Sequence, residues 1–266
     1  SYAMLISDYN ASVQEGMISI FPCAYLHNYR RHEHDPIDAE QYEIYLEDAP
    51  AFTRGEVTKL RDFIKRSIRV GDNKELIYKI DSGRIKPSKS LQDSIAKMLK
   101  GNREFIMLDE QKVVYEEILD EARLSVKDGN KRVVIVKGGP GTGKSVVAVN
   151  LLAELTKEDQ FCQYVSKNSA PRNVYRKKLK GSIRKSSVDN MFKGSGIYTE
   201  TEDNMVDTAL VDEAHRLNEK SGMFRNMGEN QIKEIIHAAK CSVFFIDESQ
   251  RVTLQDIGSV DEIRRS

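Results

Sequence analysis

The segment best suited to hold phosphate is a glycine-rich stretch near the middle of the chain. It reads Gly138, Gly139, Pro140, Gly141, Thr142, Gly143, Lys144 and Ser145, which fits the pattern GxxxxGK[ST]. Glycines permit positive φ angles, so consecutive backbone N–H groups can surround a phosphate, and a helix that begins there presents its positive end. We expect Lys144 to reach the β- and γ-phosphates of ATP and the Ser145 hydroxyl to bind Mg²⁺. The alternative is a glycine-rich turn that only resembles this motif.

A second group of chemically active residues follows an apolar run later in the chain. Ala209, Leu210 and Val211 precede Asp212 and Glu213, which places two carboxylates where a buried strand would end. A nucleotide site needs a second carboxylate for the metal and a group that activates water. We expect Asp212 to hold Mg²⁺ through a water molecule and Glu213 to orient or deprotonate the attacking water. The alternative is that this pair only caps a helix.

Two glutamines stand where an amide could contact the same nucleotide. Gln250 follows an apolar run that ends at Ile246, and a polar side chain there lies beside the γ-phosphate in a doubly wound sheet. Gln250 and Asp247 are therefore candidates to sense hydrolysis. Gln111 stands near the start of a predicted helix, and its amide could read the adenine edge through paired hydrogen bonds. An ordinary turn and an ordinary helix start are the alternatives.

Short apolar runs alternate with amphipathic stretches after residue 102. Strands are predicted at 132–136, 163–165, 208–211 and 242–246, and helices at about 111–126, 143–155 and 231–240. Short apolar strands separated by helices indicate a parallel sheet covered on both faces, and hence an α/β fold. Ligands of such sheets bind at the carboxyl ends of the strands, where the two motifs lie.

The first hundred residues are less regularly patterned. We expect a helix over 2–13, a strand over 17–25 and a polar loop over 27–40, and then amphipathic helices near 57–68 and 91–99. The change of pattern predicts a boundary near Gly101 and Asn102.

The formal net charge of the whole chain is zero, but the charged residues are unevenly distributed along the sequence. The 266 residues hold 41 Lys and Arg against 41 Asp and Glu, whereas residues 167–193 hold nine basic residues and one acidic residue, Asp189. Lys and Arg contact nucleic-acid phosphates, Asn adds hydrogen bonds and Tyr can stack on a base. The alternative is a solvated helix face. We expect single-stranded nucleic acid, DNA or RNA, to contact Lys167, Asn168, Arg172, Tyr175, Arg176, Lys177 and Lys178.

With these segments in order, the chain resembles the first RecA-like lobe of a superfamily 1 helicase, and more narrowly the Schlafen group 3-like DNA/RNA helicase domain family. The residues that carry the resemblance are 101–105, 108–111, 138–145, 212–217 and 245–252. The resemblance implies a RecA-like P-loop NTPase lobe over 103–266. It also implies a smaller α+β and helical region before it, with the remainder of a nuclease-like region over 1–50 and a helical connection over 51–102.

The resemblance further implies a second RecA-like lobe that closes on ATP and supplies an arginine finger. The sequence ends 16 residues after Gln250, so we expect a fragment without that lobe. Such a fragment should bind ATP but hydrolyse it slowly, because an absent arginine finger costs about 10³ to 10⁵ in rate.

These observations predict an ATP- and Mg²⁺-dependent motor lobe of a helicase or translocase. Its rivals are a non-motor P-loop ATPase of the assembly or switch type, and a nucleotide-binding module without unwinding activity. No apolar run approaches the ~20 residues of a membrane-spanning helix. The cysteines, Cys23, Cys162 and Cys241, lie far apart, so we expect a reducing, cytoplasmic location and no membrane partner.

Overall fold

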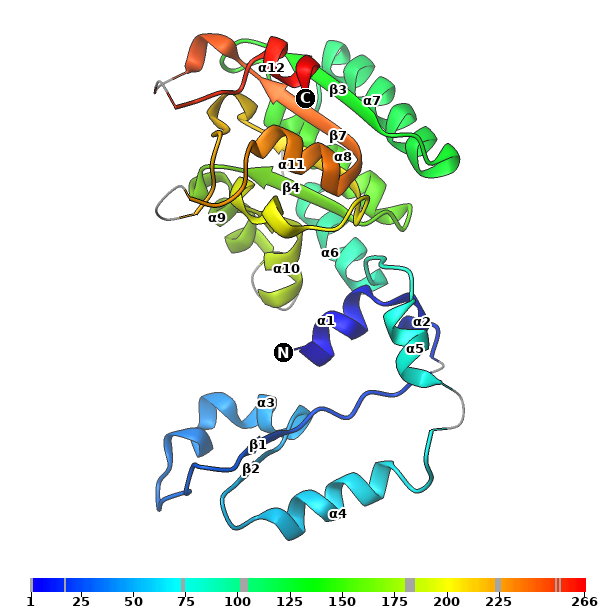
Figure 1. The fold of residues 1–266 in the computed structure, drawn as a ribbon, viewed down its shortest axis with the longest axis vertical. Coiled ribbons are helices and arrows are strands. Elements are labelled where there is room, and N and C mark those ends of the chain that lie inside the picture. The colour runs from blue at the N-terminus through cyan, green and yellow to red at the C-terminus, as the bar shows by residue number, and fades with distance from the viewer. Residues whose placement is uncertain are drawn as a thin grey trace. The chain divides into compact units, whose positions relative to one another are not determined.

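The computed structural model describes residues 2–16, 18–72, 75–100, 105–179, 185–222, 226–251, 253 and 255–266. The chain divides into two compact units, Ser1–Ile85 and Lys86–Ser266, which Figure 1 shows as a ribbon. The boundary predicted near residues 101 and 102 lies outside the described residues. Helix α6 (Lys89–Lys100) belongs to the second unit.

The second unit is built on a five-stranded sheet in which all paired strands are parallel. Its strands are β3 (Arg132–Lys137), β4 (Cys162–Ser166), β5 (Phe192–Lys193), β6 (Val206–Asp212) and β7 (Ala239–Ile246). They lie in the order β3-β7-β6-β4-β5. The predicted α/β fold with a parallel sheet is therefore confirmed, and β5 is a strand that the sequence analysis did not predict.

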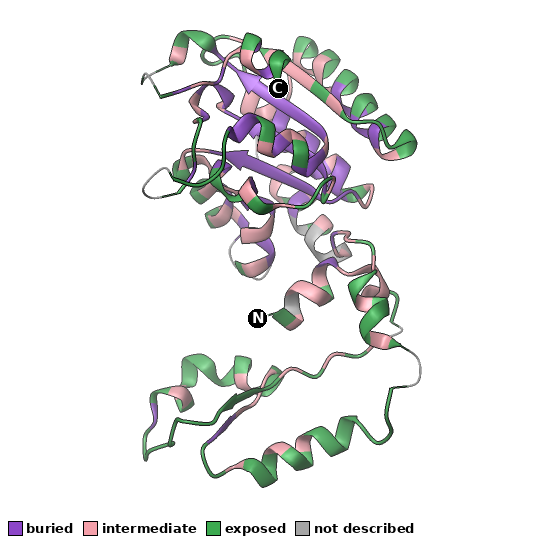
Figure 2. Ribbon diagram, in the orientation of Figure 1, coloured by how far each residue is buried: buried purple, intermediate pink, exposed green. Residues whose placement is uncertain are grey.

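The core of this unit lies in its central strands. Every residue of β4 and β6 is buried, and so is nearly every residue of β7. Figure 2 shows this concentration of buried residues in the sheet of the second unit, whereas the first unit is mostly exposed. Strands that are covered on both faces read as continuous apolar runs, which is why these three were visible in the sequence.

Helices cover both faces of the sheet. Besides α6, they are α7 (Asp109–Asp128), α8 (Lys144–Lys157), α9 (Ser169–Leu179), α10 (Lys185–Met191), α11 (Gln231–Ala238) and α12 (Val260–Arg265). Crossovers between parallel strands are right-handed. Helix α8 leads from β3 towards β4 and α11 leads back from β6 to β7, so they lie on opposite faces, with α11 in front of the sheet in Figure 1.

The carboxyl ends of the strands meet at one edge of the sheet. Lys137 pairs in register with Ile246, and Ser166 pairs with Asp212. The segments that follow β3, β4, β6 and β7 therefore begin side by side. These segments carry the glycine-rich motif, the start of the basic run, Glu213 and Asp247.

The first unit contains short elements around a two-stranded parallel sheet. They are α1 (Tyr2–Tyr9), α2 (Ala11–Gln14), β1 (Ala24–Leu26), α3 (Glu43–Asp48), β2 (Ala51–Thr53), α4 (Val57–Ser67) and α5 (Leu76–Asp81). The strand predicted over 17–25 is wrong for residues 18–23, since only Ala24–Leu26 finds a partner strand. The helix predicted over 2–13 is interrupted at Asn10, whose side chain accepts a hydrogen bond from Val13 N and begins α2.

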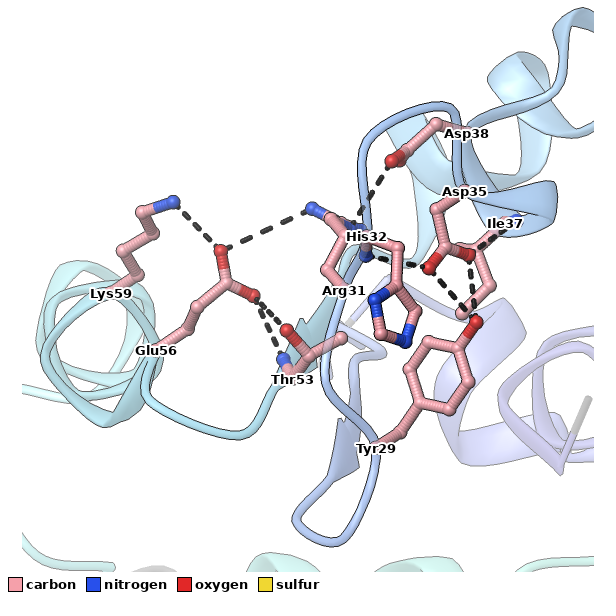
Figure 3. A network of polar contacts seen from close by, with 9 residues as sticks. All are labelled: Tyr29, Arg31, His32, Asp35, Ile37, Asp38, Thr53, Glu56 and Lys59. Carbon is pink, nitrogen blue, oxygen red and sulfur yellow. Dashed lines mark hydrogen bonds and ion pairs between the residues drawn. The ribbon is translucent and has the colours of Figure 1, made fainter.

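Two carboxylates hold the loops of the first unit (Figure 3). Asp35 is buried and accepts hydrogen bonds from the Tyr29 hydroxyl at 2.9 Å and from the backbone of His32 and Ile37. These donors lower the pKa of Asp35, the Ile37 N–H most of all. Glu56 accepts from Thr53 and Lys59 in the same way, which lowers its pKa to about 2. Both carboxylates are thus occupied by structural contacts.

Within the described residues, none of the helices combines the length and the apolar character needed to cross a lipid bilayer.

Candidate functional site

The glycine-rich segment 138–145, called the phosphate loop below, connects β3 to α8. Its first residue donates a backbone hydrogen bond from Gly138 N to the carbonyl of Ile246 at the end of β7, at 3.2 Å. Gly141 and Gly143 have φ angles of +72° and +82°, a region that side chains disfavour. Helix α8 begins at Lys144, so its free N–H groups point into the loop. The predicted strand, loop and helix therefore occur in the order that phosphate binding requires.

Lys144 lies over this loop. Its Nζ donates to the carbonyl oxygens of Gly138 at 2.6 Å and Gly139 at 2.7 Å, and the Thr142 hydroxyl also donates to Gly139 O. An ammonium group held on two carbonyls of the loop can exchange them for phosphate oxygens without leaving the loop.

Ser145 and Asp212, the two predicted metal ligands, are in direct contact. The Ser145 hydroxyl donates to Asp212 Oδ2 at 2.6 Å. The same oxygen accepts a hydrogen bond from the Tyr164 hydroxyl, and Asp212 Oδ1 accepts from Glu213 N at 2.9 Å. Asp212 is only 3% exposed, so these three donors fix the direction of its carboxylate.

Glu213 stands next to Asp212 in a left-handed backbone conformation, with φ +53°. Non-glycine residues adopt this region uncommonly, and such residues often lie at functional sites. Among the residues that the structure describes, its carboxylate is held by one side-chain hydrogen bond, from Asn168 Nδ2 to Glu213 Oε2 at 2.6 Å. The other oxygen, Oε1, is therefore the one that could meet a water molecule.

Asp247 and His215 add titratable groups beside the loop. Two hydrogen bonds from Ser249, and then the positive charge of Lys144, lower the pKa of Asp247. Burial lowers the pKa of His215, whose Nδ1 accepts from Asp247 N at 3.4 Å. Gln250 follows in the short helix η6 (Glu248–Gln250), half-buried. The hydrolysis-sensing role of Asp247 and Gln250 stays a prediction.

Gln111 touches the phosphate loop from α7. Its Nε2 donates to the carbonyl of Thr142 at 2.9 Å, while its Oε1 accepts from Leu108 N. A Cβ added to Gly143 would lie 2.1 Å from this amide nitrogen, so Gly143 also makes room for Gln111. Gln111 thus lies where it could contact a bound nucleotide, and adenine recognition stays a prediction.

The site has the composition and the unmet hydrogen-bonding capacity to accept Mg²⁺ and a nucleotide. Its candidate ligands are hydroxyl and carboxylate oxygens, which are the atoms that Mg²⁺ prefers. In the described part of the chain, two buried polar atoms at the strand ends, Asp247 Oδ2 and Ser166 Oγ, have no hydrogen-bond partner. Buried polar atoms are rarely left unpaired without a reason, and a bound ligand or ordered water would supply one.

Some basic residues of the segment 167–193 are paired with acidic residues inside or outside it. Lys167 Nζ contacts Asn218 Oδ1 at 2.9 Å and the fully buried carboxylate of Asp256 at 3.0 Å, which Arg216 also approaches at 3.2 Å. Arg176 pairs with Asp189 at 2.9 Å. Fewer of the nine basic residues of the segment are therefore available to bind a ligand than the sequence alone suggests.

Other basic side chains of the segment lie on α9, which also carries the buried ring of Tyr175. Lys177 is exposed, Arg172 is half-buried, and Lys178 Nζ lies 4.7 Å from the centre of the Phe105 ring. Tyr175 is 7% exposed and stacks on Phe192 at 5.4 Å, so its ring is not available to stack on a base.

Two contacts of the site were missed by the sequence analysis. Tyr164 lies inside a predicted strand, and nothing in the pattern indicates that its hydroxyl reaches Asp212. Asn168 was assigned to nucleic acid, whereas its amide contacts Glu213. Both contacts depend on the β4–β6 register, which the sequence does not state.

The parallel sheet, its helices on both faces and the loop between β3 and α8 define an α/β domain of the RecA-like type. The family described as Schlafen group 3, DNA/RNA helicase domain, matches residues 131–266. The chain belongs to this family, and residues 131–266 form a domain of the nucleic-acid helicase type. No curated protein matches the chain.

Proposed function

We propose that the second unit is the ATP-binding and ATP-hydrolysing lobe of a nucleic-acid helicase or translocase. The observation that carries the proposal is the 2.6 Å contact between the Ser145 hydroxyl and Asp212, because it joins the two oxygen ligands of the predicted Mg²⁺ site. The family supports a helicase-type domain, and the ATPase role rests on this geometry.

Each residue of the site has a task in this proposal. The phosphate loop and Lys144 bind the β- and γ-phosphates, and Ser145 and Asp212 would hold Mg²⁺. Mg²⁺, when bound, neutralises charge on the phosphates. Glu213 Oε1 orients the attacking water and accepts its proton, while Gln250 and Asp247 contact the γ-phosphate side of the site.

The first test is nucleotide affinity, because binding needs only residues of this lobe. Lys144→Ala should weaken binding of a fluorescent ATP analogue at least tenfold, since it removes a charged donor to phosphate worth roughly 1.5–3 kcal/mol. Lys157→Ala is the matched control, because Lys157 ends the same helix on the exposed surface and pairs only with Glu154 among the described side chains. Equal affinities of the wild type and Lys144→Ala would contradict the proposal.

We also propose that single-stranded nucleic acid contacts the basic face of α9 through Arg172, Arg176, Lys177 and Lys178. This face follows the carboxyl end of β4 directly, on the same edge as the phosphate loop. Lys167 and Asn168 remain candidates at the start of the segment, although both have partners inside the protein.

The test of this interface is the affinity for labelled single-stranded DNA and RNA. The double variant Lys177→Ala with Lys178→Ala should bind both more weakly than the wild type, whereas Lys157→Ala should not. An unchanged affinity of the double variant would show that α9 carries only a solvated basic face.

A further inference from the structure

We propose that Tyr164 and Asn168 are positioning residues that fix the two site carboxylates from β4 and the turn after it. Tyr164 holds Asp212, the predicted metal ligand, and Asn168 holds Glu213, the predicted water-activating residue. This inference rests on the proposed function, and it assigns roles to two residues that contact the predicted metal ligand and the predicted water-activating residue.

Tyr164 contacts Asp212, the predicted metal ligand, through its hydroxyl. Tyr164 is fully buried, and its hydroxyl donates to Asp212 Oδ2, the same oxygen that accepts from Ser145. The ring cannot turn away, because it packs edge-on against Tyr175 at 5.3 Å and against Phe192 at 5.7 Å. Asp212 Oδ2 is therefore fixed between the Tyr164 hydroxyl and the hydroxyl of Ser145 in the phosphate loop.

The contact of Asn168 acts on the neighbouring carboxylate. Asn168 lies immediately before α9, two residues after the end of β4, and its Nδ2 is 2.6 Å from Glu213 Oε2. The backbone of Asn168 is held as well, since its carbonyl accepts from Arg172 Nε at 3.2 Å. The backbone of Glu213 is in a left-handed conformation, and the hydrogen bond from Asn168 to Oε2 fixes the orientation of its carboxylate. This hydrogen bond therefore also determines where Oε1 points.

Both carboxylates are therefore contacted from β4 and the turn that follows it. The register pairs Tyr164 with Leu210 and Ser166 with Asp212, so the end of β4 runs beside the end of β6. Residues that orient metal ligands from behind typically contribute 10- to 100-fold to metal affinity or activity. The two residues should contribute separately, Tyr164 to the metal dependence and Asn168 to turnover.

The experiment for Tyr164 measures the Mg²⁺ concentration that half-saturates binding of a fluorescent ATP analogue. Tyr164→Phe keeps the ring and removes the hydroxyl, and we expect the half-saturating Mg²⁺ concentration to rise about 10-fold or more. The matched control is Tyr198→Phe, because Tyr198 is equally buried and donates to Gln163, away from the site. Affinity for the nucleotide without Mg²⁺ should be the same in all three proteins.

The experiment for Asn168 measures hydrolysis of bound ATP in single turnover, with protein in excess. Asn168→Ala should lower the hydrolysis rate about 10-fold while nucleotide affinity stays unchanged. Asn173→Ala is the matched control, an exposed asparagine of α9 whose side chain contacts Arg176. Asn168→Asp should be at least as slow as Asn168→Ala, because it replaces a donor with a second negative charge.

The outcomes separate this inference from the proposed function. A wild type that does not bind nucleotide contradicts both. A wild type whose binding depends on Mg²⁺, with the same half-saturation in Tyr164→Phe and the same rate in Asn168→Ala, overturns the inference alone. Loss of nucleotide affinity in Asn168→Ala, in parallel with its rate, would also overturn the positioning role of Asn168.

Discussion

The buried carboxylate of Asp256 should contribute substantially to the stability of the second unit. Its side chain is fully buried, whereas Lys167 and Arg216, which are its cationic partners among the described residues, retain 26% and 21% of their side-chain exposure. It also accepts a hydrogen bond from Thr253 N at 3.0 Å. We predict that Asp256→Asn destabilises the unit because it leaves two cations near a neutral group.

The size of the effect follows from these contacts. Breaking a buried ion pair by removal of one partner costs about 3–5 kcal/mol. Partly exposed cations recover some hydration, Lys167 keeps Asn218 as a partner, and the asparagine oxygen can still accept from Thr253. We therefore expect a loss of about 2 kcal/mol in the free energy of unfolding, or about 4–8 °C in Tm for a unit of this size.

Urea denaturation followed by circular dichroism measures this loss. Glu154→Gln is the control, because it breaks an exposed pair with Lys157 that should contribute less than about 0.5 kcal/mol. The double variant Arg216→Gln with Asp256→Asn should lose less than the sum of its single variants, since both single variants remove the same Arg216–Asp256 contact. A change below about 0.5 kcal/mol in Asp256→Asn would refute the reasoning.

Three further predictions concern the loop, the buried histidine and the aromatic cluster. Gly143→Ala should weaken nucleotide binding, measured by fluorescence titration, because φ is +82° and the new Cβ would meet the Gln111 amide. Burial lowers the pKa of His215, so the unfolded chain binds its proton more readily. Wild-type stability should therefore fall as the pH drops below about 6.5, and denaturation of His215→Asn between pH 7 and 5 should show a flatter dependence. Tyr175→Ala should cost about 3 kcal/mol in urea denaturation, as buried aromatic truncations do, and Tyr175→Phe much less.

The strands around the site were predictable because burial on both faces leaves a continuous apolar run. This signal gave β6 and β7, whose residues are almost all buried. It failed for β5, because two residues are too short to show any pattern, and for residues 18–23, where apolar side chains find no partner strand. Hydrophobicity predicts a strand only where the fold supplies a neighbour to pair with it.

The candidate site was predictable to the extent that its residues follow local rules. A loop with Lys144 and Ser145 and a strand that ends in Asp212 are fixed by short motifs and by the parallel order of the strands. Tyr164 and Asn168 follow no such rule, because their contacts depend on how far β4 extends beside β6. Residues that position others are therefore found only when the register is known.

The basic segment shows why a local charge count overstates a binding surface. Residues 167–193 carry a net charge of +8, while the acidic excess lies mainly after residue 194. The fold brings one of those acids back to the segment, since Asp256 pairs with Lys167. Asp189, which pairs with Arg176, is already counted in the net charge of +8. The positive charge available to a ligand is therefore smaller than the net charge of the segment.

The salt dependence of nucleic-acid binding measures how much of this charge remains available. Each phosphate contact with a single strand contributes about 0.7 to the slope of log affinity against log salt. Contacts from Arg172, Arg176, Lys177 and Lys178 give a slope of about 3, whereas all eight net charges would give about 6. A slope near 3 that falls by about 0.7 in Lys177→Ala would support the α9 interface. A slope near 6 would mean that basic residues of the segment outside α9 also contact the nucleic acid, and the interface would then extend beyond this helix.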